Sequence, residues 1–247
     1  MNKISLTILF VLISLFVACN VNTTDSIFDN PYQTYRTFSH SSGKEITYAV
    51  ILPELYDASA AYPVLLALPP GEQRKSQVQW AINKYWIRRS IQKNWIVISP
   101  VSPGFVTLFH TGNETLIPEF MDMLEQEYNV EGGKFHVAGI SNGGLSGFKI
   151  TLNDTARVRS LTVFPGVPPE ESDYNRLQRL QNIEVAIYVG ALDSDDWVNE
   201  TARTITIFDS LGVNYTTQTF ANDGHVINSI TSEFLFTVLD GFRVTSN

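Results

Sequence analysis

The most informative part of this 247-residue chain is AGISNGG, residues Ala138–Gly144, in which three glycines surround one serine. The stretch completes the apolar run KFHVAGI (134–140), which predicts a buried strand. It leads into GLSGFKITL (144–152), whose apolar spacing predicts a helix. Ser141 therefore stands at a turn between a strand and a helix, and the glycines beside it allow that turn to be tight.

The spacing Gly139-x-Ser141-x-Gly143 matches a nucleophile elbow, a strained turn that lifts a serine hydroxyl above the edge of a sheet. The amide groups that open the following helix would face any negative charge that develops there. A glycine-rich loop that only permits close helix packing is the alternative reading. We favour the elbow because a strand precedes the serine and a helix follows it.

The rest of the chain alternates apolar strand patterns with longer segments of helical period, which is typical of a mostly parallel sheet with crossover helices. A pattern of alternating residues predicts an antiparallel edge strand over 45–52. Further predicted strands cover 62–70, 94–100, 134–140, 159–165, 183–190 and 214–220. Predicted helices cover 80–92, 114–128, 144–152, 174–181, 199–212 and 226–242. The length and the 44% hydrophobic content favour one domain with one substantial core.

The net charge of -8 argues against a nucleic-acid partner, because neutralising phosphates requires a basic face. No His, Cys or Asp cluster has the spacing of metal ligands, so we expect no metal site. The pattern implies no organic cofactor either. The oligomeric state stays open.

The first twenty residues form a separate segment, with Lys3 followed by an apolar run from Ile4 to Ala18 that is short for a membrane span. The sequence Phe16-Val17-Ala18-Cys19 resembles the lipobox of bacterial lipoproteins, with Phe in place of the usual Leu. We therefore expect a signal peptide over 1–18, a lipid anchor on Cys19, a flexible tether over 19–32 and the folded domain over 33–247. This predicts export across the inner membrane and anchoring in the cell envelope; the membrane leaflet stays open.

A serine nucleophile requires a histidine base, and the chain has four histidines. His225 follows the last predicted strand, and Gly224 gives its loop the freedom to return over Ser141, so we take His225 as the base. His110 lies where loops meet, but it precedes the serine in the chain, so it is the second choice. His40 and His136 fall in predicted strands, where a structural role is the simpler interpretation.

The acid that orients the histidine should follow the strand 183–190, where the sequence reads GALDSDDWV (190–198). Asp193 comes three residues after Gly190 and is our first choice. Asp196 is the alternative, and Asp195 is expected to be solvated surface. Trp197 is predicted to line the substrate site.

The oxyanion formed by acyl transfer needs two amide donors. Asn142, next to the serine, is predicted to supply one. In LALPPGEQ (66–73), Pro69 and Pro70 carry no N–H, so Gly71 or its neighbour Glu72 is the first residue that can supply the other. We assign Gly71.

These motifs resemble those of α/β-hydrolases, and more narrowly feruloyl esterases, acetyl xylan esterases and polyhydroxybutyrate depolymerases. The resemblance rests on Pro-Pro-Gly (69–71), VAGISNGG (137–144), VGALD (189–193) and DGHVI (223–227), and it extends from about Gln33 to the end of the chain. It implies an eight-stranded, mostly parallel sheet with helices on both faces. The chain departs from the family in lacking a His-Gly oxyanion motif and in having one more acidic residue between Asp193 and Trp197.

The resemblance implies a serine carboxylesterase whose substrate is a small or polymer-linked ester. The short segment 166–182 leaves room for a loop and one helix only, so we expect no large cap and an open site, with Phe105 or Phe109 as further aromatic walls. A serine peptidase or thioesterase on the same fold, and a surface lipoprotein without enzymatic activity, are the alternatives.

Overall fold

The computed structural model describes residues 30–104 and 107–243. Eight strands form one sheet in the order β1-β2-β4-β3-β5-β6-β7-β8. The strands are β1 Gln33–Ser39, β2 Glu45–Ile51, β3 Val64–Leu68, β4 Ile96–Pro100, β5 Phe135–Gly139, β6 Val158–Val163, β7 Glu184–Gly190 and β8 Tyr215–Phe220. β2 is antiparallel to both β1 and β4, and every pair from β4 to β8 is parallel. The predicted eight-stranded, mostly parallel sheet is thus confirmed.

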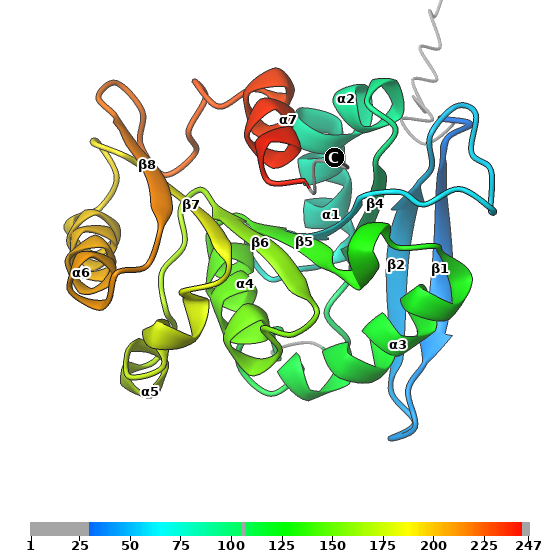
Figure 1. The fold of residues 1–247 in the computed structure, drawn as a ribbon, viewed down its shortest axis with the longest axis horizontal. Helices are drawn as coiled ribbons and strands as arrows, with labels where there is room; N and C mark the ends of the chain where they lie inside the picture. The colour runs from blue at the N-terminus through cyan, green and yellow to red at the C-terminus, as the bar shows by residue number, and fades with distance from the viewer. Residues whose placement is uncertain (1–29, 105–106, 244–247) are drawn as a thin grey trace, which may run out of the picture. The chain divides into compact units, whose positions relative to one another are not determined.

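Helices cover both faces of this sheet (Figure 1). Helices α1 (Lys75–Ala81), α2 (Ile87–Gln92) and α7 (Ser232–Gly241) lie on one face, and a π-helical turn, Ile82–Trp86, joins α1 to α2. Helices α3 (Ile117–Glu127), α4 (Asn142–Asn153), α5 (Glu171–Tyr174) and α6 (Asp195–Leu211) lie on the other. Single 3-10 turns occur at Glu114–Leu116, Glu131–Gly133 and Leu177–Leu180.

The apolar core consists of two clusters, one on each face of the sheet, because successive strand side chains point to opposite faces. In β3, Val64, Leu66 and Leu68 pack with Phe120 and Phe148 of the α3 and α4 side. The other cluster joins strand residues to α1, α2 and α7, and includes Leu65, Ala67, Trp86, Trp95 and Phe236. Strands buried on both faces explain the continuous apolar runs in the sequence.

Several local expectations differ from the structure. The strand 45–52 is not an edge strand, because β1 pairs with it on its outer side. The polar and aromatic residues of β1 gave only a weak strand pattern in the sequence. The predicted helix 174–181 is instead α5 followed by a 3-10 turn, and α7 begins only at Ser232. His40 lies just after β1, in the turn to β2, whereas His136 is in β5 as expected.

The segment between β6 and β7 holds only α5 and the turn Leu177–Leu180, so no cap domain is inserted there. Within residues 30–104 and 107–243, no helix has the length and apolar character needed to span a bilayer. The same residues contain no group of three His, Cys, Asp or Glu side chains placed to hold a metal ion. The expected signal peptide, Cys19 and most of the tether lie outside the described residues.

Candidate active site

Ser141 stands on a strained turn between β5 and α4. Its backbone has φ 56° and ψ -122°, a conformation that L-residues rarely adopt. The turn is held by a hydrogen bond from the Ser141 amide to the Pro165 carbonyl, with an N···O distance of 2.8 Å. A strained serine between a strand and a helix is the geometry expected of a nucleophile elbow.

The glycines around Ser141 are required by close backbone contacts. A Cβ atom on Gly139 would lie 2.0 Å from the Gly143 carbonyl oxygen. A Cβ on Gly143 would lie 2.2 Å from the Leu68 carbonyl oxygen, at the end of β3. A Cβ on Gly144 would lie 2.3 Å from the Pro165 carbonyl oxygen, just past β6. The elbow is therefore packed between the ends of β3 and β6, the two strands that flank β5.

The structure brings the three predicted triad residues together at the carboxyl ends of β5, β7 and β8. His225 Nε2 lies 2.8 Å from Ser141 Oγ. His225 Nδ1 lies 2.9 Å from Asp193 Oδ2 and 3.1 Å from Oδ1. Because a carboxylate can only accept, Nδ1–H donates to Asp193, and this leaves Nε2 free to accept the serine proton.

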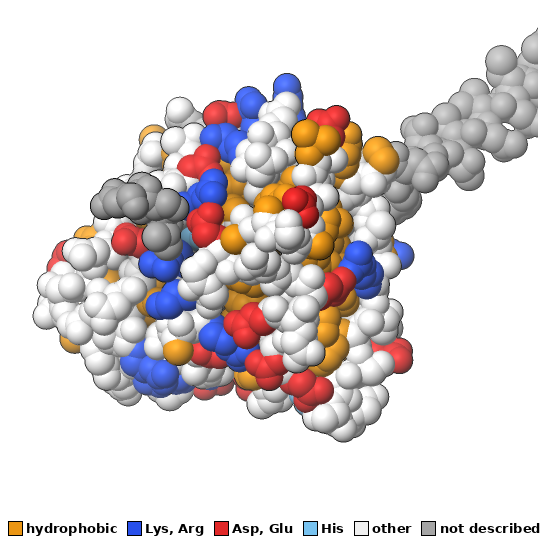
Figure 2. All heavy atoms as spheres, turned by 45° about the vertical axis from the view of Figure 1, so that its right-hand side comes forward, with side chains coloured by type: hydrophobic (Ala, Val, Ile, Leu, Met, Phe, Trp, Pro, Cys, Tyr) orange, Lys and Arg blue, Asp and Glu red, His pale blue; other side chains and the backbone are white. Residues whose placement is uncertain are grey.

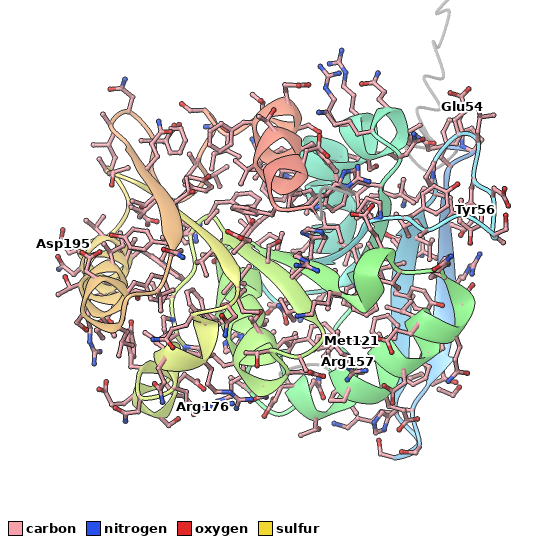
Figure 3. The ribbon with its side chains drawn as sticks, in the orientation of Figure 1. Glu54, Tyr56, Met121, Arg157, Arg176 and Asp195 are labelled. Carbon is pink, nitrogen blue, oxygen red and sulfur yellow. The ribbon has the colours of Figure 1, made fainter. Side chains whose placement is uncertain are left out.

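Burial separates Asp193 from the other candidate acids. Its side chain is 3% exposed, and its Oδ1 also accepts a hydrogen bond of 2.7 Å from the Ser194 amide. Asp195 and Asp196 are exposed in the first turn of α6, where their charges suit the positive end of the helix dipole. Figure 3 shows Asp195 on the outer side of α6, away from the sheet.

The loop that carries His225 is fixed against the loop that carries Asp193. The Leu192 amide donates to the Asp223 carbonyl oxygen at 2.9 Å, and a Cβ on Gly190 would lie 2.3 Å from that same oxygen. The Asp223 carboxylate accepts from the amides of Asn228 and Ser229 at 3.0 and 3.2 Å. Hydrogen bonds from Ser229 lower the pKa of Asp223, which keeps the carboxylate ionised in this loop.

A hollow of about 350 Å³ opens above Ser141 and His225. Its walls are mainly apolar, and they include Trp80 of α1 and Val226, which are 40% and 41% exposed. Gly71 also lines it, with φ +60°, and no described group accepts a hydrogen bond from the Gly71 amide. Its neighbour Glu72 instead forms an exposed ion pair with Arg74 and does not line the hollow.

Beneath the Gly71 loop lies a buried polar network centred on Gln73, which the sequence did not single out. Gln73 Nε2 donates to Ser146 Oγ at 2.9 Å, and its Oε1 accepts from the Phe109 amide at 2.9 Å. Ser146 Oγ donates to the Asn142 carbonyl oxygen at 2.8 Å and lies 3.0 Å from His110 Nδ1. Burial lowers the pKa of His110, so the ring stays neutral within this network.

Trp197, Phe105 and Phe109 were predicted to line the site, and the two that the structure describes do not. Trp197 is not a wall of the hollow: its ring packs against His225, with centroids 5.2 Å apart. Phe109 is fully buried in the core, so it forms no wall, and Phe105 lies outside the described residues. The wall that sequence reasoning missed is Trp80, because helical spacing alone does not distinguish a core face from a face toward the site.

Several solved structures share this architecture. A thermostable esterase aligns with a TM-score of 0.70 and 13% identity over 85% of this chain and 63% of its own. Dipeptidyl peptidase 4 of Porphyromonas gingivalis aligns with a TM-score of 0.67 and 13% identity over 85% of this chain and 35% of its own. A ferulic acid esterase aligns with a TM-score of 0.63 and 16% identity over 85% of this chain and 94% of its own.

The chain thus spans less than two thirds of the first two proteins and nearly the full length of the third. No family model matches the sequence, and no curated protein matches it either. At these identities the likeness concerns the fold, which is the α/β-hydrolase fold expected from the motifs.

Proposed function

We propose that this protein is a serine hydrolase that cleaves carboxylic esters through an acyl-enzyme. The observation that carries the proposal is the continuous hydrogen-bonded chain from Ser141 Oγ through the His225 ring to the buried Asp193. A hydroxyl on a strained elbow, an imidazole that can accept its proton and a carboxylate that fixes the imidazole are the parts required for acyl transfer.

In the first half of the reaction, Ser141 Oγ attacks the ester carbonyl carbon while His225 Nε2 takes the hydroxyl proton. The carbonyl oxygen becomes an oxyanion, which the amides of Gly71 and Asn142 stabilise. The intermediate collapses with cleavage of the bond to the alcohol oxygen, and His225 returns its proton to that oxygen. Water then repeats the sequence on the acyl-enzyme and frees the acid and Ser141.

The hollow above the serine supports an ester whose reacting part is apolar. Trp80, Ile140 and Val226 offer hydrocarbon surface beside Ser141. Because no cap domain is inserted between β6 and β7, a bulky or polymer-linked alcohol can reach this surface from solvent. Esters attached to polysaccharides or other bulky alcohols are therefore our proposed substrates.

The test is turnover of 4-nitrophenyl acetate together with labelling by a fluorophosphonate. Ser141→Ala and His225→Ala should each lower kcat by roughly four to six orders of magnitude with unchanged folding, because triad members act as one unit. Exposed Ser76→Ala is the matched control and should behave as wild type. Full activity and stoichiometric labelling in Ser141→Ala would refute the proposal.

A peptidase activity is the second candidate, because a dipeptidyl peptidase is among the solved structures with this fold. The amide and ester of one acyl group, for example alanine 4-nitroanilide and alanine methyl ester, distinguish the two. We expect hydrolysis of the ester to be the faster. A faster amide would favour the peptidase.

We also propose that Cys19 carries a lipid that holds the domain at a membrane of the cell envelope. The support is the sequence Phe16-Val17-Ala18-Cys19 after an apolar run. Metabolic labelling with a palmitate analogue should mark the wild type and not Cys19→Ala. Equal labelling of both would end this part of the proposal.

A further inference from the structure

A second hollow, of about 380 Å³, lies between the helical segment after α1 and the start of α7. One wall is the helical segment that includes the π-helical turn and the start of α2, and it presents Lys84, Arg88 and Arg89. The other wall is the segment that includes Asn228 and the first residues of α7. Helices α1, α2 and α7 lie side by side on this face of the sheet (Figure 1). We call this hollow the basic groove.

The basic groove is positively charged although the whole chain carries -8. Its lining holds three cations and one carboxylate, Glu233, which gives a formal balance of +2. Arg89 is neutralised by Glu233 at 2.5 Å. Lys84 donates to Asn228 Oδ1 at 2.9 Å, and its charge also acts on the nearby Asp223 carboxylate, whose pKa is lowered by hydrogen bonds from Ser229 and by Lys84. The Arg88 side chain is exposed, and within the described residues it has no ion pair or hydrogen bond.

On the face drawn in Figure 2, Lys and Arg side chains are interspersed with Asp and Glu. At the basic groove, the α7 wall adds to the attraction for an anion, because the first turn of a helix is its positive end.

No described residue lines both hollows, but residues one helical turn apart do line them. Trp80 lines the first hollow, and Lys84 Nζ lies 5.8 Å from the centre of its ring. Lys84 thus lies beside Trp80, and Lys84 and Arg88 both face the groove, although a π-helical turn interrupts the segment between Trp80 and Arg88. From Trp80 to Arg88 the segment advances by about 10 Å, less than the ~12 Å of a regular α-helix, because the π-helical turn lies between them.

The chemistry of the triad determines which part of an ester faces the groove. His225 returns its proton to the alcohol oxygen, so the alcohol must lie beside the imidazole. The residues after His225 lead through Val226, which lines the first hollow, to Asn228, which lines the basic groove. The alcohol is therefore the part that extends toward Lys84 and Arg88.

Building on the proposed ester hydrolysis, we propose that the basic groove is a specificity subsite for an anionic group on the alcohol portion of the substrate. The preferred ester has an apolar or aromatic segment against Trp80 and, at the far end of that segment, a carboxylate that reaches Lys84 and Arg88. Lys84 and Arg88 bind that carboxylate through charge-assisted hydrogen bonds.

The test compares two substrates that differ only in charge, 4′-acetoxybiphenyl-4-carboxylate and its carboxamide. We expect the wild type to have a kcat/KM about ten-fold higher for the carboxylate, with a preference that shrinks as salt screens the charges. Lys84→Gln/Arg88→Gln should bring the ratio of the two constants close to one. Using the ratio within each protein removes any general change in activity.

Lys134→Gln/Arg179→Gln is the control variant. It lies at the opposite ends of the strands, removes the same charge and should keep both the ratio and the activity.

A wild-type ratio near one, or a ratio retained by Lys84→Gln/Arg88→Gln, would overturn the subsite. Calorimetric titration of Ser141→Ala with 4′-hydroxybiphenyl-4-carboxylate and its carboxamide tests the groove without turnover. Tighter binding of the carboxylate than of the carboxamide, with the difference lost in Lys84→Gln/Arg88→Gln, supports the subsite even if neither ester is cleaved. Failure to cleave either ester would count against the proposed ester hydrolysis and not against the subsite. Equal binding of the two compounds would overturn the subsite.

Discussion

The side-chain amide of Asn142 donates a hydrogen bond to the Gly71 carbonyl oxygen, with an N···O distance of 2.9 Å. The bond joins the two segments whose backbone amides we assign to the oxyanion hole. The Gly71 carbonyl lies on the far side of the Gly71 Cα from the Gly71 amide, so the bond restricts rotation of this residue and holds its amide near the elbow before a substrate arrives.

Replacing Asn142 by Ala should lower kcat for 4-nitrophenyl acetate by about ten-fold and change KM little, because the amides remain but one is less firmly held. Steady-state kinetics measure this. Asn175→Ala, at an exposed position after α5, is the control. An unchanged kcat in Asn142→Ala would show that the bond does not position the Gly71 amide.

Among the acids after β7, only Asp193 should matter for turnover. Asp193→Asn should reduce kcat by roughly two to four orders of magnitude, since a misoriented imidazole retains part of its basicity. Asp195→Asn and Asp196→Asn should stay near the wild type because both side chains are exposed on α6. If Asp196→Asn were the damaging change, the acid would be misassigned by three residues.

The glycines of the elbow should be intolerant of a single added methyl group. Gly143→Ala places a Cβ 2.2 Å from a backbone oxygen at the end of β3 and should destabilise the fold by more than about 4 kcal/mol. Gly241→Ala, at the end of α7 with nothing within 4 Å of the new Cβ, should be neutral or stabilise by about 0.5–1 kcal/mol. Urea unfolding compares the two. A Gly143→Ala protein as stable as the wild type would contradict the packing described.

His136 should make stability depend on pH. Burial lowers its pKa to about 3, with a further contribution from Arg159 and Arg243. Below the unfolded-state pKa of about 6.5, the unfolded chain takes up a proton that the folded chain does not, so stability falls as pH falls.

Between about pH 6 and about pH 4, His136 should cost the wild type about 1.4 kcal/mol per pH unit. His136→Asn, which can keep a hydrogen bond to Ser160, should remove this part of the slope in urea titrations. Parallel slopes for wild type and His136→Asn would refute this.

The open hollow predicts ordinary saturation kinetics. With 4-nitrophenyl butyrate the rate should rise hyperbolically through the solubility limit of the ester, because no cap has to move before a substrate enters. A jump in rate at the limit, or a lag before turnover, would show that a segment covers the site.

The sequence was sufficient to predict the fold class because the buried strands and the elbow are local signals. It also predicted which Ser, His and Asp meet, since parallel strands deliver their following loops to one edge of the sheet. It could not predict Trp80 as a wall or the inward turn of Phe109, since both depend on how a loop and a helix pack after the sheet has formed. The Gln73 network was equally hidden, because a glutamine between Glu72 and Arg74 reads as solvated surface.

The wedging of the elbow between the ends of β3 and β6 links reactivity to the state of the whole sheet. Ser141 can keep its unusual backbone angles only while Leu68 and Pro165 press on the glycines beside it, and those residues come from distant parts of the chain. A fragment, or a chain whose strands have separated, would present an ordinary serine. The extent of fluorophosphonate labelling would then count native molecules, and in a urea series it would fall together with the spectroscopic signal of global unfolding.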